Sequence, residues 1–154
     1  MIEDCQFSQK GGVAPVAGNI GLKLSKLYHA DVQRVTAFGL YDGIVSDVSA
    51  SVSMNNIWAG NNLNDGVILK NNGIDHYISN SHSDGNAGIG WHFTDFQAPY
   101  LTNVLALQNT VNGIKIDKTS TGNFQFFFNN VISDTSGQDN CVINDLNRGS
   151  FTNF

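Results

Sequence analysis

The chain is poor in the residues that build helices and cross-links. Among its 154 residues there are only two Pro, two Cys and a single Glu, and Glu, Lys and Arg together number nine. So few helix-forming charged residues argue against an all-helical protein and against a coiled coil. Hydrophobic residues still make up 41% of the chain. That share is enough for a core and argues against disorder.

Basic residues are also scarce, and they are scattered. Eight Lys and Arg against 13 Asp and Glu give a net charge of −5. A nucleic-acid surface needs a stripe of basic side chains, so we expect no nucleic-acid partner, and an anionic membrane surface is disfavoured for the same reason. No apolar run approaches the ~20 residues of a transmembrane helix, so we expect no membrane insertion. The start of the chain has no secretory signal, so we expect either a product that is not secreted by that route or a piece of a longer chain.

Turn-forming residues are abundant and recur with a period. The chain has 20 Asn, 16 Gly, 13 Ser and 12 Asp. A turn residue followed by apolar residues occurs six times, at intervals of 22 to 27 residues. The six segments are Gly21–Leu24, Gly43–Ser46, Gly66–Leu69, Gly88–Trp91, Gly113–Ile116 and Asn140–Ile143. Four of the six follow an Asp or Asn, and such pairs predict bends with positive φ.

Each repeat also holds a second segment of β type. These segments are Ile2–Phe7, Val32–Phe38, Val52–Trp58, Tyr77–Ser81, Leu101–Leu107 and Phe124–Ile132. Two short strands per repeat predict an all-β parallel solenoid of about six coils, stacked at ~4.8 Å. A leucine-rich-repeat solenoid is the competing fold, because Leu101–Asn109 resembles one such repeat. The other coils do not keep that Asn, and none has a helical half, so the β-helix is favoured.

The coils fill residues 1–154 as a single domain, and both ends lack a cap, so we expect a fragment of a longer chain. Strand alternation directs one apolar residue of each central coil into the core, namely Ile44, Val67, Ile89 and Ile114. Cys5 and Cys141 lie five coils apart, too far for a disulfide, and are expected to be small core residues. With two distant Cys and no close His pair, we expect no metal site and no cofactor.

The ladder of Gly-Ile/Val segments, the irregular loops and the Asn-rich turns carry a resemblance to a known group of proteins. The turns are Asn55-Asn56, Asn61-Asn62, Asn71-Asn72 and Asn129-Asn130. The chain resembles the right-handed parallel β-helix proteins of the pectate-lyase-like superfamily, and among them most the shaft of a bacteriophage tailspike. The signature clusters of pectate lyases and polygalacturonases do not occur in it.

The resemblance implies recognition and degradation of a bacterial surface polysaccharide by a hydrolase or lyase. It also implies a homotrimer that folds in the host cytoplasm and then resides in the virion or outside the cell. The alternative is a non-catalytic shaft or a glycan-adsorption module of a spike. The crowded Phe residues at positions 124 and 126–128 favour a trimer, because they cannot all point inward and one or two can face a neighbouring subunit.

The first candidate site is a ladder of outward side chains. At the third position after the first apolar residue, successive coils carry Ser25, Asp47, Lys70, His92, Asp117 and Asn144. A lyase needs a base that removes a proton beside a uronate carboxylate, and a cation that neutralises that carboxylate. We assign these roles to His92 and Lys70, with Asp47 and Asp117 on the same face. The alternative is an ordinary solvated ladder of charges.

Two further candidates lie nearby. Asp42 and Asp65 occupy equivalent places, ~5 Å apart as in a retaining glycosidase, but both precede Gly at a bend where Asp is favoured. The segment Gly90–Tyr100 mixes aromatic and polar residues as sugar sites do. Its candidate substrate-binding residues are Asp95, Tyr100, Trp91 and Phe96, although Trp91 also suits the core. His82 and Asp84, in the preceding loop, equally fit a turn.

Overall fold

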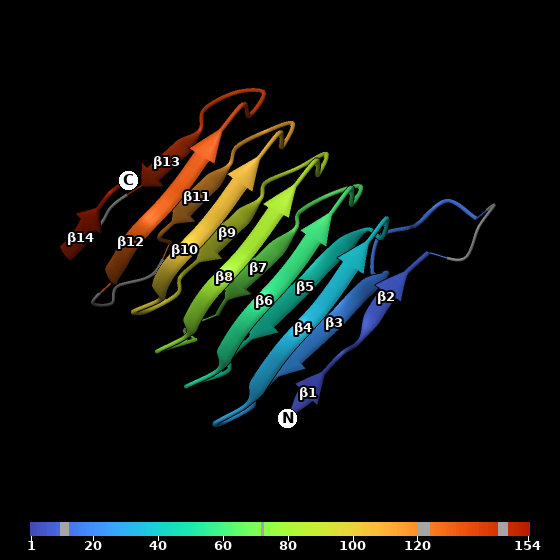
Figure 1. The fold of residues 1–154 in the computed structure, drawn as a ribbon, viewed down its shortest axis with the longest axis horizontal. Helices are drawn as coiled ribbons and strands as arrows, with labels where there is room; N and C mark the ends of the chain where they lie inside the picture. Colours follow the sequence, from blue (N-terminus) through green and yellow to red (C-terminus); the bar gives the residue numbers. More distant parts are fainter. Residues whose placement is uncertain (10–12, 72, 120–123, 145–147) are drawn as a thin grey trace.

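The computed structural model describes residues 1–9, 13–71, 73–119, 124–144 and 148–154. These residues form strands joined by turns and bends. They include no helix, and hence none that could cross a membrane. Successive strands lie side by side along one axis from the N-terminal to the C-terminal end (Figure 1).

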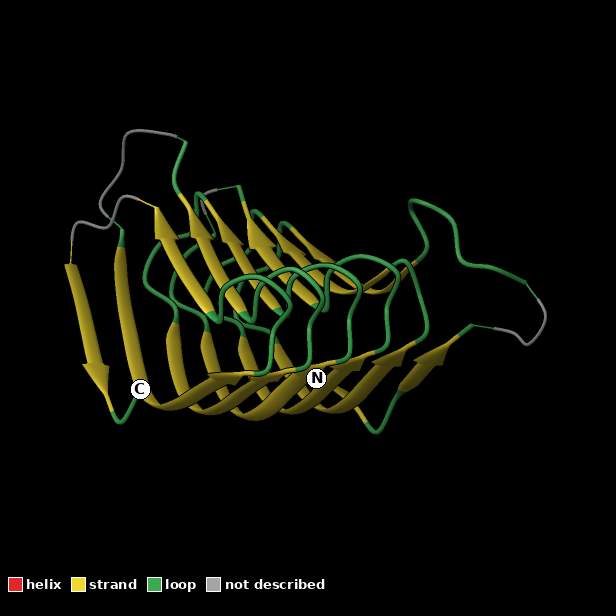
Figure 2. Ribbon diagram, turned by 90° about the horizontal axis from the view of Figure 1, so that it is seen from above, coloured by secondary structure: helices red, strands yellow, loops and turns green. Residues whose placement is uncertain are grey.

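The strands belong to two parallel sheets that face each other across the core (Figure 2). The long-strand sheet holds β1 (Ile2–Glu3), β2 (Gln6–Ser8), β4 (Asp31–Phe38), β6 (Ser53–Gly60), β8 (Tyr77–Asp84), β10 (Tyr100–Leu107), β12 (Gln125–Asp134) and β14 (Arg148–Thr152). The short-strand sheet holds β3 (Ile20–Ser25), β5 (Asp42–Asp47), β7 (Val67–Lys70), β9 (Trp91–Thr94), β11 (Ile114–Asp117) and β13 (Cys141–Asn144). The predicted fold class, an all-β parallel solenoid, is confirmed.

The core lies between the two sheets and is built from rows of equivalent residues. In β7, Val67 and Leu69 are fully buried, whereas the residues between and after them are partly exposed, as period-two alternation requires. The same pattern repeats in β9 and β11. One central row of partners is Ile44, Val67, Trp91 and Ile114.

That row corrects the predicted register of the fourth coil. Trp91, not Ile89, lies opposite Val67, so Gly90 rather than Gly88 is the equivalent of Gly66. The error is two residues. Since strand side chains alternate with a period of two, the inward and outward faces of β9 are still as predicted.

The backbone geometry of the turn glycines also differs from the prediction. Gly66 does not have a positive φ; instead, a Cβ there would lie 1.9 Å from Ser83 Oγ and 2.6 Å from Asn86 Nδ2. Glycine is required because neighbouring groups approach its Cα closely. Positive φ occurs at other positions, among them Asn61 (50°) and Asn71 (60°) in the turns and Asn80 (49°) and Asn103 (54°) in the middle of long strands.

Two ladders of asparagine side chains run along the solenoid axis. The buried ladder joins Asn62 Nδ2 to Asn86 Oδ1 (2.8 Å) and Asn86 Nδ2 to Asn109 Oδ1 (2.9 Å). The exposed ladder lies at the bend of the long strands and links Asn80, Asn103 and Asn130. Each ladder connects a coil to the next by side-chain hydrogen bonds in addition to the sheet.

The cysteine and phenylalanine side chains lie largely as expected. Cys5 and Cys141 are free thiols at opposite ends of the solenoid, partly buried against the core, and burial raises the pKa of Cys141 to about 11. The rings of Phe124, Phe126 and Phe128 are buried. The ring of Phe127 is partly exposed and stacks on Tyr100.

Candidate functional site

The outward ladder exists, but His92 does not belong to it. The observed row of partners is Asp47, Lys70, Thr94, Asp117 and Asn144. His92 lies in the neighbouring outward row, opposite Ile68 on one side and Lys115 on the other. The predicted position of His92 in this row, between Lys70 and Asp117, is therefore wrong by the two-residue shift of the coil, although the expected contact of His92 with Asp117 is present. His92 still faces outward, because the shift is even.

Two carboxylates and a hydroxyl surround the His92 ring. Its Nδ1 lies 2.7 Å from Asp65 Oδ2, and its Nε2 lies 3.2 Å from Asp117 Oδ2 and 3.1 Å from Thr94 Oγ1. The side chain of His92 is 21% exposed, and that of Asp65 is 9% exposed. The ring is thus fixed in orientation yet reachable from solvent. We call these four residues, together with Lys70 and Lys115, the His92 face.

Each protonation state of His92 has a hydrogen-bond partner on this face. When the ring is neutral with its proton on Nδ1, it donates to Asp65, and Nε2 can accept the hydroxyl proton of Thr94. When the ring is protonated, Nε2 donates instead to Asp117. The ring can therefore gain and lose a proton at Nε2 without losing its orientation, as general acid and base catalysis requires.

Asp65 has a structural task as well as its bond to His92. Its Oδ1 accepts the backbone N–H of Ile89 at 2.8 Å, one coil further along. The equivalent Asp42 accepts from Asn64 Nδ2 at 2.8 Å and from the backbone N–H of Asp65 at 3.4 Å. The turn interpretation of the two Asp residues therefore agrees with the structure, except that the backbone donors belong to the next coil rather than to the same turn.

The contacts of His92 with Asp65 and Thr94, and its pairing with Lys115, were not predicted from the sequence. A signal for them was present. Aligning Gly90 with Gly66 and Gly113 gives more even coil lengths than aligning Gly88, and it puts Thr94 beside Asp117 and Lys115 beside His92.

Positive charge lies close to His92 on the same face. Burial acts to raise the pKa of Asp117, but hydrogen bonds from Asn144, Lys115 and His92 lower it below its ordinary value overall, so the carboxylate is charged. Lys115 Nζ lies 2.9 Å from Asp117 Oδ2. Lys70 forms no ion pair with any described residue, which leaves its ammonium group available to an external anion.

The proposed sugar-binding residues do not gather around His92. Trp91 and Phe96 are buried in the core, with Trp91 Nε1 donating to the carbonyl of Leu105 at 2.9 Å, so neither ring can touch a sugar at the surface. The carboxylate of Asp95 accepts the backbone N–H of Thr119 at 2.6 Å, which ties it to the next coil. These three positions are explained by the fold.

Tyr100 lies on the other sheet. It begins β10, far around the coil from β9, and its ring stacks between Tyr77 and Phe127. Burial, together with Asp75 and Tyr77, raises its pKa. The expectation that Tyr100 adjoins His92 is therefore wrong, because the chain turns from one sheet to the other between the two residues.

His82 and Asp84 belong to a strand, not to a loop. Both lie in β8, where Asp84 Oδ1 accepts from Trp58 Nε1 at 2.5 Å and the His82 ring lies 5.3 Å from the indole. No three His, Cys, Asp or Glu side chains of the described residues form a set that could hold a metal ion.

Comparison with known proteins finds the fold but no sequence relative. No family model matches the chain, and no curated protein matches it. Three crystal structures of the periplasmic alginate epimerase AlgG, two of them mutants, share the fold with TM-scores of 0.74 to 0.75 at 12% sequence identity. The match covers 86% of this chain and 35% of AlgG, so the chain spans about a third of that protein. At this identity the likeness shows the fold, a parallel β-helix.

Proposed function

We propose that this β-helix acts on an acidic polysaccharide and that His92 transfers the proton. The observation that carries the proposal is the His92 ring, which is held between Asp65 and Asp117 and whose side chain is 21% exposed. The fold supports it, because AlgG, which shares the fold, is named as an epimerase of the polysaccharide alginate. A flat sheet of stacked coils also offers an extended polymer a continuous surface along the axis.

The reaction class that suits the face is proton abstraction beside a uronate carboxylate. Neutral His92 takes the proton at Nε2, while Asp65 holds Nδ1–H and stabilises the imidazolium that forms. Lys70, which has no carboxylate partner among the described residues, neutralises the substrate carboxylate. In a lyase, the bond to the neighbouring glycosidic oxygen then breaks, a carbon–carbon double bond forms, and protonated His92 gives this proton to the leaving oxygen. In an epimerase, water on the opposite face protonates the same carbon, and His92 releases its proton to solvent.

The setting that we propose for this activity is a tailspike-like depolymerase of a bacteriophage. In that setting the chain is part of a homotrimer that recognises a bacterial surface polysaccharide. Exposed apolar side chains such as Ile132, which is 49% exposed, favour contact with other subunits. Light scattering of the intact protein tests the assembly, and a monodisperse monomer would contradict it.

The second candidate function is a non-catalytic shaft or adsorption module. It is favoured by the side-chain hydrogen bonds that join neighbouring coils on the same face, from Asn71 Nδ2 to Asp47 and from Asn144 Nδ2 to Asp117, both at 2.7 Å. A ladder that satisfies its own polar groups stabilises the sheet without any substrate.

Replacement of His92 by Ala separates the two functions. The intact protein is incubated with acidic polysaccharides, and chain length and the absorbance of unsaturated uronates are followed. We expect cleavage or epimerisation to fall roughly 10²- to 10⁴-fold in His92→Ala, the usual contribution of a general base. His29→Ala is the matched control, because His29 is exposed and lies outside the His92 face. Full activity in both variants would contradict the role of His92, and the absence of activity in the unsubstituted protein would favour the shaft.

A further inference from the structure

A stack of aromatic rings runs along the outer face of the long-strand sheet. Tyr77 and Tyr100 lie with centroids 4.9 Å apart and planes 11° from parallel, and Tyr100 and Phe127 with 4.6 Å and 4°. The separations are close to the spacing of the coils, so each ring turns its face toward the next coil. Ser53 precedes the stack in this row, and Ser150 follows it. The stack therefore ends at a residue too small to cover the outer face of Phe127.

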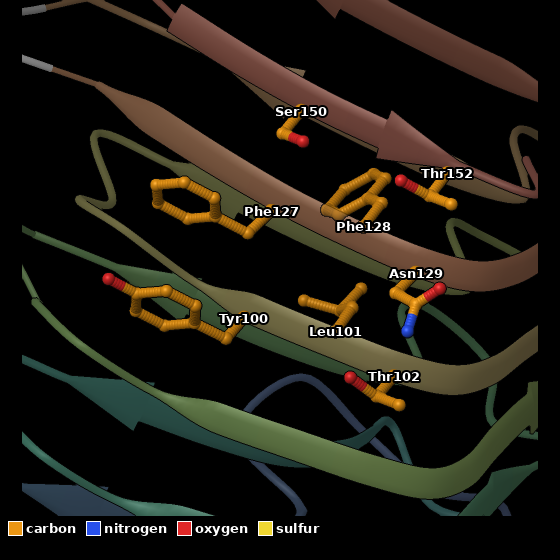
Figure 3. A pocket seen from close by; sticks show the side chains of 8 residues that line it. All are labelled: Tyr100, Leu101, Thr102, Phe127, Phe128, Asn129, Ser150 and Thr152. Atoms are coloured by element: carbon orange, nitrogen blue, oxygen red, sulfur yellow. The ribbon is translucent and has the colours of Figure 1, made fainter.

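A hollow of about 400 Å³ opens at this end of the stack, across β10, β12 and β14 (Figure 3). The residues that line it are Tyr100, Leu101, Thr102, Phe127, Phe128, Asn129, Ser150 and Thr152. Figure 3 shows the rings of Tyr100 and Phe127 along one side, and the polar side chains of Thr102, Asn129 and Thr152 along the other. The hollow is thus apolar on one side and hydrogen-bonding on the other.

A pyranose ring has the complementary surface. Its C–H face packs on an aromatic ring, while its hydroxyl groups exchange hydrogen bonds with hydroxyl and amide side chains. None of the eight lining residues carries a charge. The carboxylate of a uronate would lose its hydration here without gaining a cation as partner. A neutral sugar has no charged group and does not pay this desolvation cost.

We propose that this hollow binds a neutral sugar residue, with its ring on the open face of Phe127 and its hydroxyls on Asn129, Ser150 and Thr152. The sugar ring takes the place that a fourth aromatic side chain would have in the stack. Asn129 and Thr152 are exposed and offer both donors and acceptors.

This inference rests on the proposed function only in taking a polysaccharide as the ligand. The two surfaces lie on different sheets and differ in charge: Lys70, Lys115 and Asp117 lie on the short-strand sheet, whereas uncharged residues line the hollow. The hollow would therefore hold neutral units of a chain whose acidic units are processed elsewhere. Binding at the hollow needs no catalysis at His92.

The test uses the intact protein and a panel of neutral oligosaccharides built from glucose, mannose, galactose or rhamnose, titrated by calorimetry. We expect Phe127→Ala to weaken binding roughly tenfold through the lost ring contact. Ser150→Tyr keeps every native group of the stack but fills the open place, and it is expected to abolish binding. Ser53→Tyr adds the same side chain at the far end of the stack and is expected to leave binding unchanged.

Several outcomes would overturn the proposal. They are the absence of binding across the whole panel, undiminished binding in Ser150→Tyr, and self-association through this face that Ser150→Tyr abolishes in light scattering. The last would identify the stack as a contact between copies of the chain. The His92→Ala variant is expected to keep its affinity for the neutral sugar, so failure of the proposed reaction and failure of this site give different results.

Discussion

At the scale of single residues, the least expected feature is a buried histidine. His76 is fully buried, and its Nε2 lies 2.8 Å from Ser46 Oγ while its Nδ1 lies 3.2 Å from the carbonyl of Ile74. A carbonyl only accepts, so Nδ1 carries the proton and Ser46 donates to Nε2. Burial lowers the pKa of His76 to about 4, although the bond to Ile74 acts in the opposite direction.

We expect this histidine to make the stability of the fold depend on pH. The ordinary pKa of His is 6.5 and that of folded His76 is about 4, so as the pH falls the unfolded chain takes up the proton first. The contribution of neutral His76 to the free energy of unfolding is complete above pH 6.5 and is lost as the pH falls through 4. Urea unfolding should show a loss of about 2 to 3 kcal/mol between about pH 7 and about pH 4.5.

A double replacement isolates this effect from the titration of carboxylates. In Ser46→Ala with His76→Leu, both partners of the buried hydrogen bond become apolar, so no unpaired group remains. We expect the unfolding free energy of this variant to depend less on pH in that window. An unchanged pH dependence would show that His76 has the same pKa in the folded and the unfolded chain.

The residues of the His92 face show what a sequence can predict and what it cannot. The outward direction of His92 follows from strand alternation alone, and it was predicted correctly. Its contacts with Asp65 and Thr94 depend on which residues of adjacent coils are partners. That pairing requires the length of every connection, which the apolar pattern does not determine.

At the scale of strands, the fourth coil explains why the register was misjudged. Gly88-Ile89-Gly90-Trp91 contains two glycines, each followed by an apolar residue, so either fits the repeat pattern. The core decides between them, because the Trp91 ring fills the space between the sheets next to Val67 and Ile114. The strands themselves were predicted well, since apolar alternation is local and needs no knowledge of pairing.

The buried asparagine ladder was not predicted, although one of its residues, Asn62, stands in an Asn-rich turn. Asn86 uses all of its amide: Oδ1 accepts from the backbone N–H and Nδ2 of Asn62, and Nδ2 reaches Asn109 Oδ1 and the carbonyl of Ala59. Asn is ordinarily read as an exposed turn residue. In this fold, the stacking of equal turns lets the amides satisfy one another inside the protein.

Removing one member of the buried ladder should cost far more than removing one of the exposed ladder. We expect Asn86→Ala to lower the unfolding free energy by about 2 to 4 kcal/mol, because buried groups on both sides lose their partners. Asn103→Gly is the matched control, since glycine accepts the positive φ of 54° at this exposed position, and its cost is expected to stay below about 1 kcal/mol. Equal losses of unfolding free energy in the two variants, measured by urea unfolding, would contradict the larger role of the buried ladder.

At the scale of the whole molecule, each coil contacts mainly the coils beside it. In the long-strand sheet β8 pairs with β6 and β10, and in the short-strand sheet β9 pairs with β7 and β11. Such a molecule behaves as a one-dimensional array, whose stability is nearly a sum over coils and the contacts between neighbours. A whole coil can then be removed if the new neighbours present matching faces.

We expect a variant without residues 91–113 to fold. The deletion joins Gly90 to Ile114, which occupies the same place in the coil as Trp91, so Val67 gains Ile114 as its partner and Tyr77 gains Phe127. The inward and outward faces are kept throughout. Loss of Trp91 and its aromatic neighbours should lower the midpoint of thermal unfolding, but circular dichroism should still show β structure and one cooperative transition.

The control deletion removes residues 91–112 and leaves one residue more. Gly113 then takes the place of Trp91 opposite Val67, and every later side chain of the strand turns to the other face, which exposes Ile114 and Ile116 and buries Lys115. A buried Lys without a partner and an exposed apolar row should prevent folding of the C-terminal coils. Two outcomes would show that the register of this solenoid does not determine its stability. Either the two variants unfold with the same midpoint, or the variant without residues 91–113 fails to fold while the variant without residues 91–112 folds.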